Sequence, residues 1–299
     1  MNKLLGISVL VVVISVAAYM GYESRFYDAP DAKTYDVIDA EGKVIDQFTI
    51  PKITDVVGHK DEEAILYGMR LLNETARLLP DNVGNGLNCN SCHMGQGKRE
   101  LGAPYINTYN RYPRFNPRAQ RVLDLNERIN GCFQRSMNGK PIPIDSPEMQ
   151  GMHAYMKWLG GDVAPGNTVK LTSLEFFKVG KYTANANNGA QVYAAQCGTC
   201  HGSDGEGIKD QFGDYIFPPL WGDDSFNIGA GMARASRAGA FVIHNMPLSV
   251  SREAPLGQIT LSEQEVVDVV EYFTKKPRPD FAGKENDWPG MDNPADSRY

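Results

Sequence analysis

The sequence lacks three features, and each absence excludes a class of protein. It has no excess of positive charge, since 30 Lys and Arg stand against 36 Asp and Glu, and a net charge of −6 argues against bulk nucleic-acid binding. It has only five cysteines, none before Cys89, which excludes a lipoprotein anchor. Its apolar run from Leu4 to Met20 is slightly short for a membrane span, which needs about 20 apolar residues.

That apolar run follows Lys3, and Val16-Ala17-Ala18 offers small residues for cleavage. This pattern is typical of a secretory signal. We therefore expect residues 1–22 to be a signal peptide or a signal anchor. The mature protein is expected in the periplasm of a Gram-negative bacterium, with membrane contact only if this segment is retained.

Two short motifs contain four of the five cysteines. They are Cys89-Asn90-Ser91-Cys92-His93 and Cys197-Gly198-Thr199-Cys200-His201. C-x-x-C-H is the attachment signature of c-type haem: the two thiols bond the haem, and the adjacent imidazole becomes the proximal iron ligand. The sequence therefore predicts two covalently bound haem c groups, attached at Cys89, Cys92, Cys197 and Cys200, with His93 and His201 on the irons.

Cysteine pairs with this spacing also occur in two other kinds of site. A C-x-x-C pair alone can be a redox dithiol or half of a zinc site. In a zinc ribbon, however, the two pairs lie about 15–20 residues apart, and here Cys92 and Cys197 are far more widely separated. Neither alternative explains why histidine directly follows each pair, so haem is favoured.

The repeated motif predicts a mostly α fold of two tandem cytochrome c-like haem domains with long loops. The first domain is expected over residues 23–165 and the second over 187–277, joined by a linker at 166–186. Residues 278–299 are rich in Pro, Asp and Gly, and we expect them to form a C-terminal wrap or tail.

Local patterns predict one hairpin and four helices. The hairpin lies within residues 28–57, where two apolar segments flank a polar turn. Each helix is expected to begin at a cap residue and to bury one apolar face. The expected helices are Asp61 to about Leu79, Ser146 to Leu159 with Met149, Met152 and Met156 in its stripe, a short one from Asn188 through Tyr193, and one from Ser262 with Val266, Val269, Val270 and Phe273 in its stripe.

The distal iron ligands follow from comparing the two halves. Met246 lies 16 residues before the helix cap Ser262, and the odd thiol Cys132 lies 14 residues before the equivalent cap Ser146. A methionine thioether is a common sixth ligand of haem c. We therefore expect Met246 on the second iron and Cys132 on the first. The alternatives are His244 and Met232 for the second haem, and Met137, Met149, Met152 and His153 for the first.

These two ligands would give the haems different potentials. An anionic thiolate favours ferric iron, whereas a neutral thioether favours ferrous iron. The first haem should therefore have the lower potential, so that electrons run from the first haem to the second and then to a partner.

The region around Cys132 is basic. Between residues 98 and 135 there are eight basic and three acidic residues, and 8 − 3 gives +5 in a chain of net −6. Part of this charge can form a solvated face or bind haem propionates. The excess beside a thiol also suggests a pocket for a small anion, since the arginine fork suits oxyanions.

The segment from Asn126 to Gly139, NERINGCFQRSMNG, closely resembles the thiosulfate dehydrogenase / tetrathionate reductase family of dihaem cytochromes c. The resemblance extends over nearly all of the chain after the signal, including Asn245-Met246-Pro247 and Asp287-Trp288-Pro289. It implies that Cys132 is the distal ligand of an active-site haem. It also implies that Arg118, Arg128 and Ser136 line the substrate pocket.

The resemblance further implies an activity: conversion of two thiosulfates to tetrathionate and two electrons at the first haem, and the reverse. The second haem would relay electrons to a small electron-carrier cytochrome. Some relatives carry lysine beside the second-haem methionine, whereas Asn245 stands here, which favours plain His/Met ligation. The alternatives are a dihaem electron carrier without its own catalysis, and a haem subunit of a sulfur-oxidation complex.

Overall fold

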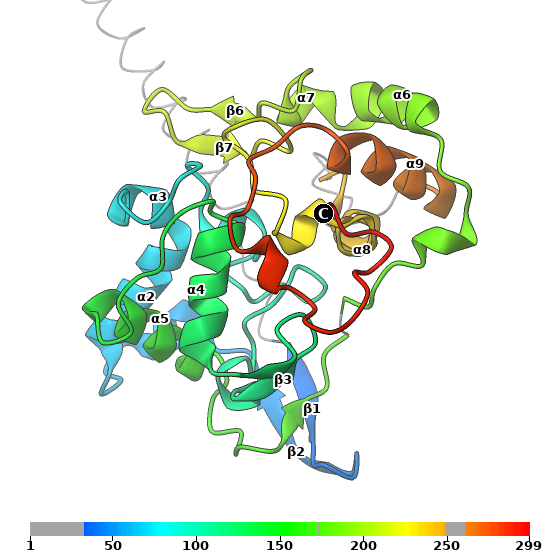
Figure 1. The fold of residues 1–299 in the computed structure, drawn as a ribbon. Helices are drawn as coiled ribbons and strands as arrows, with labels where there is room; N and C mark the ends of the chain where they lie inside the picture. The colour runs from blue at the N-terminus through cyan, green and yellow to red at the C-terminus, as the bar shows by residue number, and fades with distance from the viewer. Residues whose placement is uncertain (1–32, 173, 249–260) are drawn as a thin grey trace, which may run out of the picture.

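The computed structural model describes residues 33–172, 174–248 and 261–299. The expected signal peptide or anchor lies outside these residues. Within them, every helix is too short or too polar to cross a membrane. The described elements form two helical units with a few short strands, and the C-terminal segment runs along both units (Figure 1).

The first unit is built on the packing of α2 (Glu62–Asn73) against α5 (Pro147–Trp158). Helix α5 begins as predicted, because the Ser146 side chain accepts a hydrogen bond from the Met149 amide and Pro147 takes the first helical position. The predicted apolar stripe of α5 is confirmed as core. Its members Met149, Met152, Met156 and Leu159 are all buried.

The predicted helix from Asp61 to Leu79 is interrupted. Helix α2 ends at Asn73, and a separate short helix α3 spans Thr75–Leu78. The break buries the hydroxyl of Thr75, which accepts a hydrogen bond from the Cys89 amide at 3.0 Å. The Asn88 side chain accepts from the Ala76 amide, also at 3.0 Å. The interruption therefore ties the helix end to the first C-x-x-C-H motif.

The second unit repeats this arrangement with α6 (Ala186–Gln196) packed on α9 (Glu263–Thr274). The capping box at Ser262 and Glu265 is confirmed. The predicted cap Asn188 is wrong. Asn185 caps α6 by accepting from the amides of residues 187 and 188, while the Asn188 side chain donates to Asp268 on α9 at 2.7 Å.

A glycine permits the close helix contact in each unit. A Cβ on Gly68 of α2 would lie 1.9 Å from the Gly151 carbonyl oxygen of α5. A Cβ on Gly189 of α6 would lie 2.0 Å from the Asp268 carbonyl oxygen of α9. Both distances are far below van der Waals contact, so only glycine allows the backbones to approach this closely.

The predicted N-terminal hairpin is confirmed as β1 (Thr34–Ile38) and β2 (Val44–Thr49), paired antiparallel. A third strand, β5 (Thr168–Val169), pairs with the other edge of β1. This strand lies within the range expected to be a linker, so the start of that range belongs to the sheet of the first unit. The sheet buries Val37, Phe48 and Ile50 in a small core of its own.

The elements that position the site are shorter. In the first unit, β3 (Arg114–Asn116) and β4 (Arg121–Leu123) form a hairpin that leads into α4 (Leu125–Arg135), which begins with a capping box at Asp124 and Glu127. The second unit has α7 (Gly198–His201), the hairpin β6 (Ile208–Lys209) with β7 (Tyr215–Phe217), and α8 (Ala235–Asn245). The 3-10 turns are η1 (Ile53–Val56), η2 (Cys89–Ser91), η3 (Tyr109–Arg111), η4 (Val179–Lys181), η5 (Gly231–Ala233) and η6 (Lys284–Asn286).

Candidate active site

The first C-x-x-C-H motif presents a neutral, oriented imidazole. His93 Nδ1 lies 2.5 Å from the Ala103 carbonyl oxygen, and its ring stacks on Tyr105 with centroids 4.3 Å apart. Burial lowers the pKa of His93 to about 4, although the Ala103 carbonyl acts in the opposite direction. A hydrogen bond at Nδ1 leaves Nε2 as the ligand nitrogen, as a proximal haem ligand requires.

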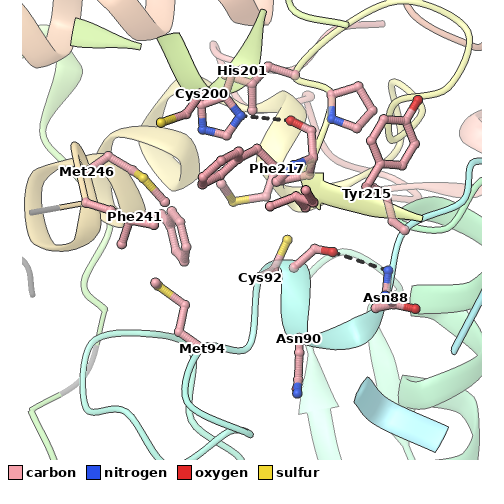
Figure 2. A pocket seen from close by; sticks show the side chains of 18 of the residues that line it. Asn88, Asn90, Cys92, Met94, Cys200, His201, Tyr215, Phe217, Phe241 and Met246 are labelled. Atoms are coloured by element: carbon pink, nitrogen blue, oxygen red, sulfur yellow. Dashed lines mark hydrogen bonds between the residues drawn. The ribbon is translucent and has the colours of Figure 1, made fainter. Parts of the chain in front are cut away.

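The second motif has the same design. His201 Nδ1 lies 2.8 Å from the Pro218 carbonyl oxygen, and burial lowers the pKa of His201. Phe217 packs edge-on at 6.5 Å between ring centroids. Figure 2 shows this imidazole beside Cys200, with the Met246 thioether on the wall nearby.

Both motifs open into one large cavity. Its volume is about 1580 Å³, and Cys92 from the first unit lines it together with Cys197, Cys200 and His201 from the second. Met246 lines this cavity as well (Figure 2). The walls therefore come from both units.

Polar atoms on the cavity wall fit the carboxylates of haem. The side-chain amide of Asn90 and Nη1 of Arg99 are buried without a hydrogen-bond partner among the described residues, and both residues line the large cavity. Buried polar groups are normally paired, so these atoms suit a cofactor with propionates. The zinc alternative has no such support, because the described residues contain no group of three or more His, Cys, Asp or Glu that could hold a metal ion.

The thiol predicted as a distal ligand is held by an arginine. Arg128 and Cys132 lie one turn apart on α4, and Arg128 Nη1 donates to Cys132 Sγ at 2.7 Å. The negative charge of this sulfur raises the pKa of Arg128, against the effect of burial. Cys132, His93 and Cys89 line the same small cavity of about 70 Å³. The structure therefore brings the odd thiol, its arginine and the first haem motif together.

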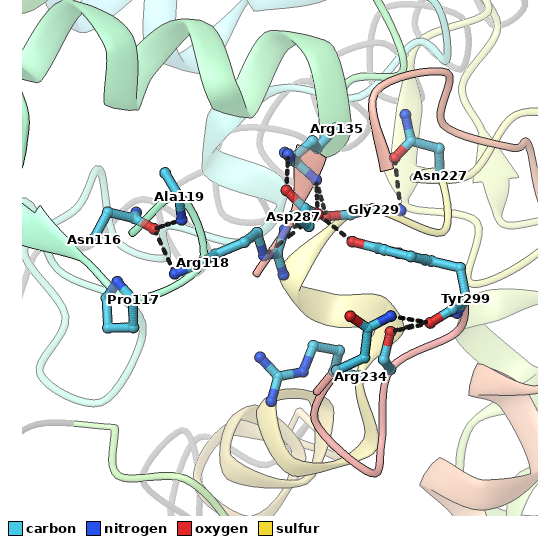
Figure 3. A network of polar contacts seen from close by, with 12 residues as sticks. Asn116, Pro117, Arg118, Ala119, Arg135, Asn227, Gly229, Arg234, Asp287 and Tyr299 are labelled. Carbon is cyan, nitrogen blue, oxygen red and sulfur yellow. Dashed lines mark hydrogen bonds and ion pairs between the residues drawn. The ribbon is translucent and has the colours of Figure 1, made fainter. Parts of the chain in front are cut away.

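The family resemblance also implied that Ser136 and Arg118 line the substrate pocket, and the structure places these two residues differently from each other. Ser136 ends α4 and lines the small cavity beside Cys132. Arg118 does not line either cavity, and neither does Arg128, which contacts the site through Cys132. Nη1 of Arg118 donates to the Gly229 carbonyl oxygen at 2.5 Å (Figure 3). The Arg118 guanidinium lies 5.1 Å from the Trp288 ring centroid.

The alternative ligands are placed as follows. Met137 and Met152 also line the small cavity, as members of the buried core. Met149 and His153 do not line it, and His153 packs edge-on against Tyr109. In the second unit Met232 lines the large cavity with Met246, whereas His244 does not.

Several site residues were missed by sequence reasoning. Tyr105, Met94 and the carbonyl of Ala103 belong to a loop without a recognisable pattern. The Pro218 carbonyl belongs to the apolar loop Phe217-Pro218-Pro219-Leu220, whose composition suits packing on a haem edge and which lines the large cavity. The histidine-binding carbonyl lies 10 residues after His93 but 17 after His201, so the internal repeat could not reveal it. Arg99 is one of the eight basic residues between positions 98 and 135, but nothing in the sequence distinguishes it from the other seven.

Comparison with known proteins agrees with this geometry. The family described as SoxA/TsdA, cytochrome c domain, matches residues 81–162, and the cytochrome c family matches residues 186–277. Each match contains one C-x-x-C-H motif. The chain thus has two cytochrome c domains, and each binds one haem c covalently.

Similar proteins share one name. A thiosulfate dehydrogenase of Psychrobacter arcticus is 42% identical over 260 residues, which cover 86% of this chain and 74% of that one. One of Allochromatium vinosum is 40% identical, covering 73% and 80%. The solved thiosulfate dehydrogenase (TsdBA) of Marichromatium purpuratum matches with a TM-score of 0.68 at 32% identity. That match covers 78% of this chain, which spans about half (50%) of the solved chain. These relatives, together with the two haem motifs and the thiol bound by an arginine, show that the chain belongs to the thiosulfate dehydrogenase family of dihaem cytochromes c.

Proposed function

We propose that this chain oxidises thiosulfate to tetrathionate at the first haem domain. The observation that carries the proposal is the Arg128–Cys132 pair, with 2.7 Å between Nη1 and Sγ, beside the cavity of the first C-x-x-C-H motif. An electron carrier needs no thiol held by a guanidinium at its haem. The relatives that carry the name thiosulfate dehydrogenase supply the substrate.

We assign the iron ligands by the donors that each cavity offers. His93 and Cys132 would hold the first haem iron, and His201 and Met246 the second. When bound, the two haems supply two one-electron acceptors. In this assignment the thiolate-bound haem has the lower potential and the thioether-bound haem the higher.

The sulfur of Cys132 is a suitable group to carry the substrate between two half-reactions. In the first, the Cys132 thiolate and the outer sulfur of one thiosulfate form an S–S bond and release two electrons. In the second, the outer sulfur of another thiosulfate attacks that bond; tetrathionate leaves, and the thiolate returns. The sum is 2 S₂O₃²⁻ → S₄O₆²⁻ + 2 e⁻, with no proton exchanged. Because thiol–disulfide exchange is reversible, tetrathionate reduction follows the same steps backwards.

Positive charge makes the meeting of two dianions feasible. The Arg128 guanidinium faces Cys132 and offsets the repulsion between the thiolate and an incoming thiosulfate. Ser136 lines the same cavity and can donate a hydroxyl hydrogen bond to a sulfonate oxygen. Cys132 and Ser136 line a largely apolar cavity, where electrostatic interactions are stronger than in water.

The released electrons require a partner outside the chain. We assign this role to a small electron-carrier cytochrome that accepts electrons from the second haem. Because haem c is attached outside the cytoplasm, we place the protein in the periplasm.

Addition of thiosulfate to the purified, oxidised protein tests the function. We expect reduction of the haem bands and one tetrathionate for every two electrons taken up. A dihaem carrier without catalysis would show no thiosulfate-dependent reduction. A subunit of a sulfur-oxidation complex would show it only after a partner chain is added. Either of these results would refute the proposal.

A further inference from the structure

A series of stacked arginines leads from the surface of the second domain to α4. Arg237 of α8 and Arg234, the N-cap residue of that helix, share the ring of Phe176, at 3.5 and 5.5 Å from its centroid. Arg234 and Arg118 in turn share the ring of Trp288, at 5.6 and 5.1 Å. The series connects the two domains through two aromatic rings.

The inner end of this series joins the helix of the reactive thiol. Arg118 and Arg135 both donate to the Gly229 carbonyl oxygen, at 2.5 and 3.3 Å (Figure 3). Arg135 follows Arg128 at i+7 and Cys132 at i+3 on α4, so all three lie on one face of the helix. The arginines therefore end on the face that carries Cys132.

Carboxylates neutralise only part of this charge. Asp287 pairs with Arg135 at 2.7 Å, and Asp296 pairs with Arg234 at 2.9 Å. Arg118, Arg135, Arg234 and Arg237 bring four positive charges against these two negative ones, so 4 − 2 leaves +2.

Arg237 occupies the outer, exposed position. No residue that the structure describes accepts a hydrogen bond from it or pairs with it at salt-bridge distance, and its guanidinium is held flat on Phe176. Partial desolvation against Phe176 lowers the pKa of Arg237, and repulsion from neighbouring arginines lowers it further.

We propose that Arg237 is an anion-recruiting residue, which binds sulfur oxyanions at the domain boundary and raises their concentration near Cys132. A planar guanidinium pre-organised on an aromatic ring offers two parallel donors to a sulfonate group. Positive charge that carboxylates do not neutralise also speeds the arrival of a dianion. This inference rests on the proposed function and extends it to substrate capture.

Calorimetric titration of the oxidised holoprotein with tetrathionate tests the role of Arg237 apart from catalysis, because oxidised haems hold no electrons for its reduction. At low salt we expect Arg237→Gln to weaken tetrathionate binding about tenfold, the scale of one charge-assisted hydrogen bond. Arg237→Lys should recover only part of this loss, because it keeps the charge but loses the fork. Lys43→Gln makes the same charge change on the exposed tip of the N-terminal hairpin and should leave binding unchanged.

Steady-state kinetics supplies the second readout. Arg237→Gln should raise KM for thiosulfate by a similar factor while kcat, haem content and the potentials of both haems stay at wild-type values. Equal tetrathionate affinity in wild type and Arg237→Gln would overturn the inference, as would an equal loss in Lys43→Gln. A wild-type protein that thiosulfate does not reduce would instead overturn the proposed function.

Discussion

At the scale of single residues, Cys132 differs from the other cysteines in its partner. The four cysteines of the motifs are half-buried, and each bonds a haem as a thioether, which leaves no thiol to ionise. Cys132 instead accepts a hydrogen bond from a guanidinium. The sequence alone shows that Cys132 is the one cysteine outside the two haem motifs and that the residues around it are basic. The hydrogen bond follows from the helical spacing of residues 128 and 132. Helix α4 itself was not predicted, although the capping box of Asp124 and Glu127 is a helix-start pattern that a sequence can show.

Replacement of Cys132 tests its proposed role directly. We expect Cys132→Gly and Cys132→Met to retain both covalent haems but to lose activity in both directions by at least about a hundredfold, because the sulfur that carries the substrate is gone. Haem content by pyridine haemochrome and turnover with thiosulfate or tetrathionate measure this. Met137→Leu is the matched control, since Met137 lines the same cavity and leucine preserves its volume. Retained turnover in Cys132→Gly would remove the thiol from the mechanism.

At the scale of elements, the sequence predicted the helices whose ends carry strong caps. Ser146 and Ser262 start α5 and α9 as expected, because serine at each N-cap accepts a hydrogen bond from the amide three residues later. The interruption before α3 could not be predicted, since its reason is a tertiary contact between Thr75 and Cys89. The same holds for the cap of α6, where Asn188 is used instead to bind Asp268.

The helix crossings should tolerate no side chain at their glycines. Alanine is favoured over glycine in a helix by about 1 kcal/mol, but a Cβ at position 68 or 189 would lie about 2 Å from a carbonyl oxygen of the facing helix. The clash outweighs the helix propensity. We expect Gly68→Ala and Gly189→Ala each to reduce the free energy of unfolding by about 2–4 kcal/mol. Denaturation of the holoprotein measures this, and Gly180→Ala, with open space around it, should be near neutral.

The carboxylate of Glu100 helps to attach the N-terminal hairpin to the rest of the first domain. Glu100 accepts from Lys33 Nζ at 2.5 Å and from the Thr172 amide at 2.8 Å. Burial alone would raise the pKa of Glu100, but these donors lower it to about 2. The ionised form is therefore stabilised by folding. Its contribution is complete above the unfolded pKa of about 4.3 and is lost as the pH falls towards about 2.

Glu100→Gln should therefore destabilise the protein at neutral pH but not in acid. Because Lys33 is exposed, screening limits the expected loss to about 1 kcal/mol at pH 7. Thermal unfolding of wild type and variant between about pH 7 and pH 2 measures the difference, which should shrink below about pH 4.3. A difference that stays constant over this range would show that the charge of Glu100 does not matter.

At the scale of the whole molecule, the C-terminal segment fastens the domains together. The Asp287 side chain is buried and accepts from both terminal nitrogens of Arg135, at 2.7 and 2.8 Å, and from the Tyr299 hydroxyl (Figure 3). The Trp288 amide donates to the Arg118 carbonyl at 2.7 Å, and Arg234 of the second domain binds Asp296. Composition predicted a wrap or tail but could not predict its contacts with the two domains, because the partners lie far apart in the chain: 62 residues for Arg234 and Asp296 and 152 for Arg135 and Asp287.

Neutralisation of Asp287 should loosen this fastening. Asp287→Asn keeps the shape of the side chain but leaves the Arg135 guanidinium without a counter-charge in a partly buried site, which we expect to cost about 3 kcal/mol. Chemical denaturation measures the loss, and faster hydrogen exchange of the C-terminal amides should accompany it. Asp280→Asn, which breaks an exposed pair with Lys284, should leave both unchanged. Equal stability of Asp287→Asn and wild type would mean that the segment is held by its other contacts.

The large cavity has one more consequence, because its walls belong to both domains. Neither half can be excised without opening the other half's cofactor site to solvent. Solvent around a haem changes its reduction potential. The haem of a domain produced alone would therefore have a different reduction potential from the same haem in the intact chain. A chimaera made by exchanging domains between relatives would likewise need matching walls on both sides of the large cavity. One contact that must match is the hydrogen bond from the Asn245 side-chain amide to the Leu101 carbonyl, at 2.8 Å.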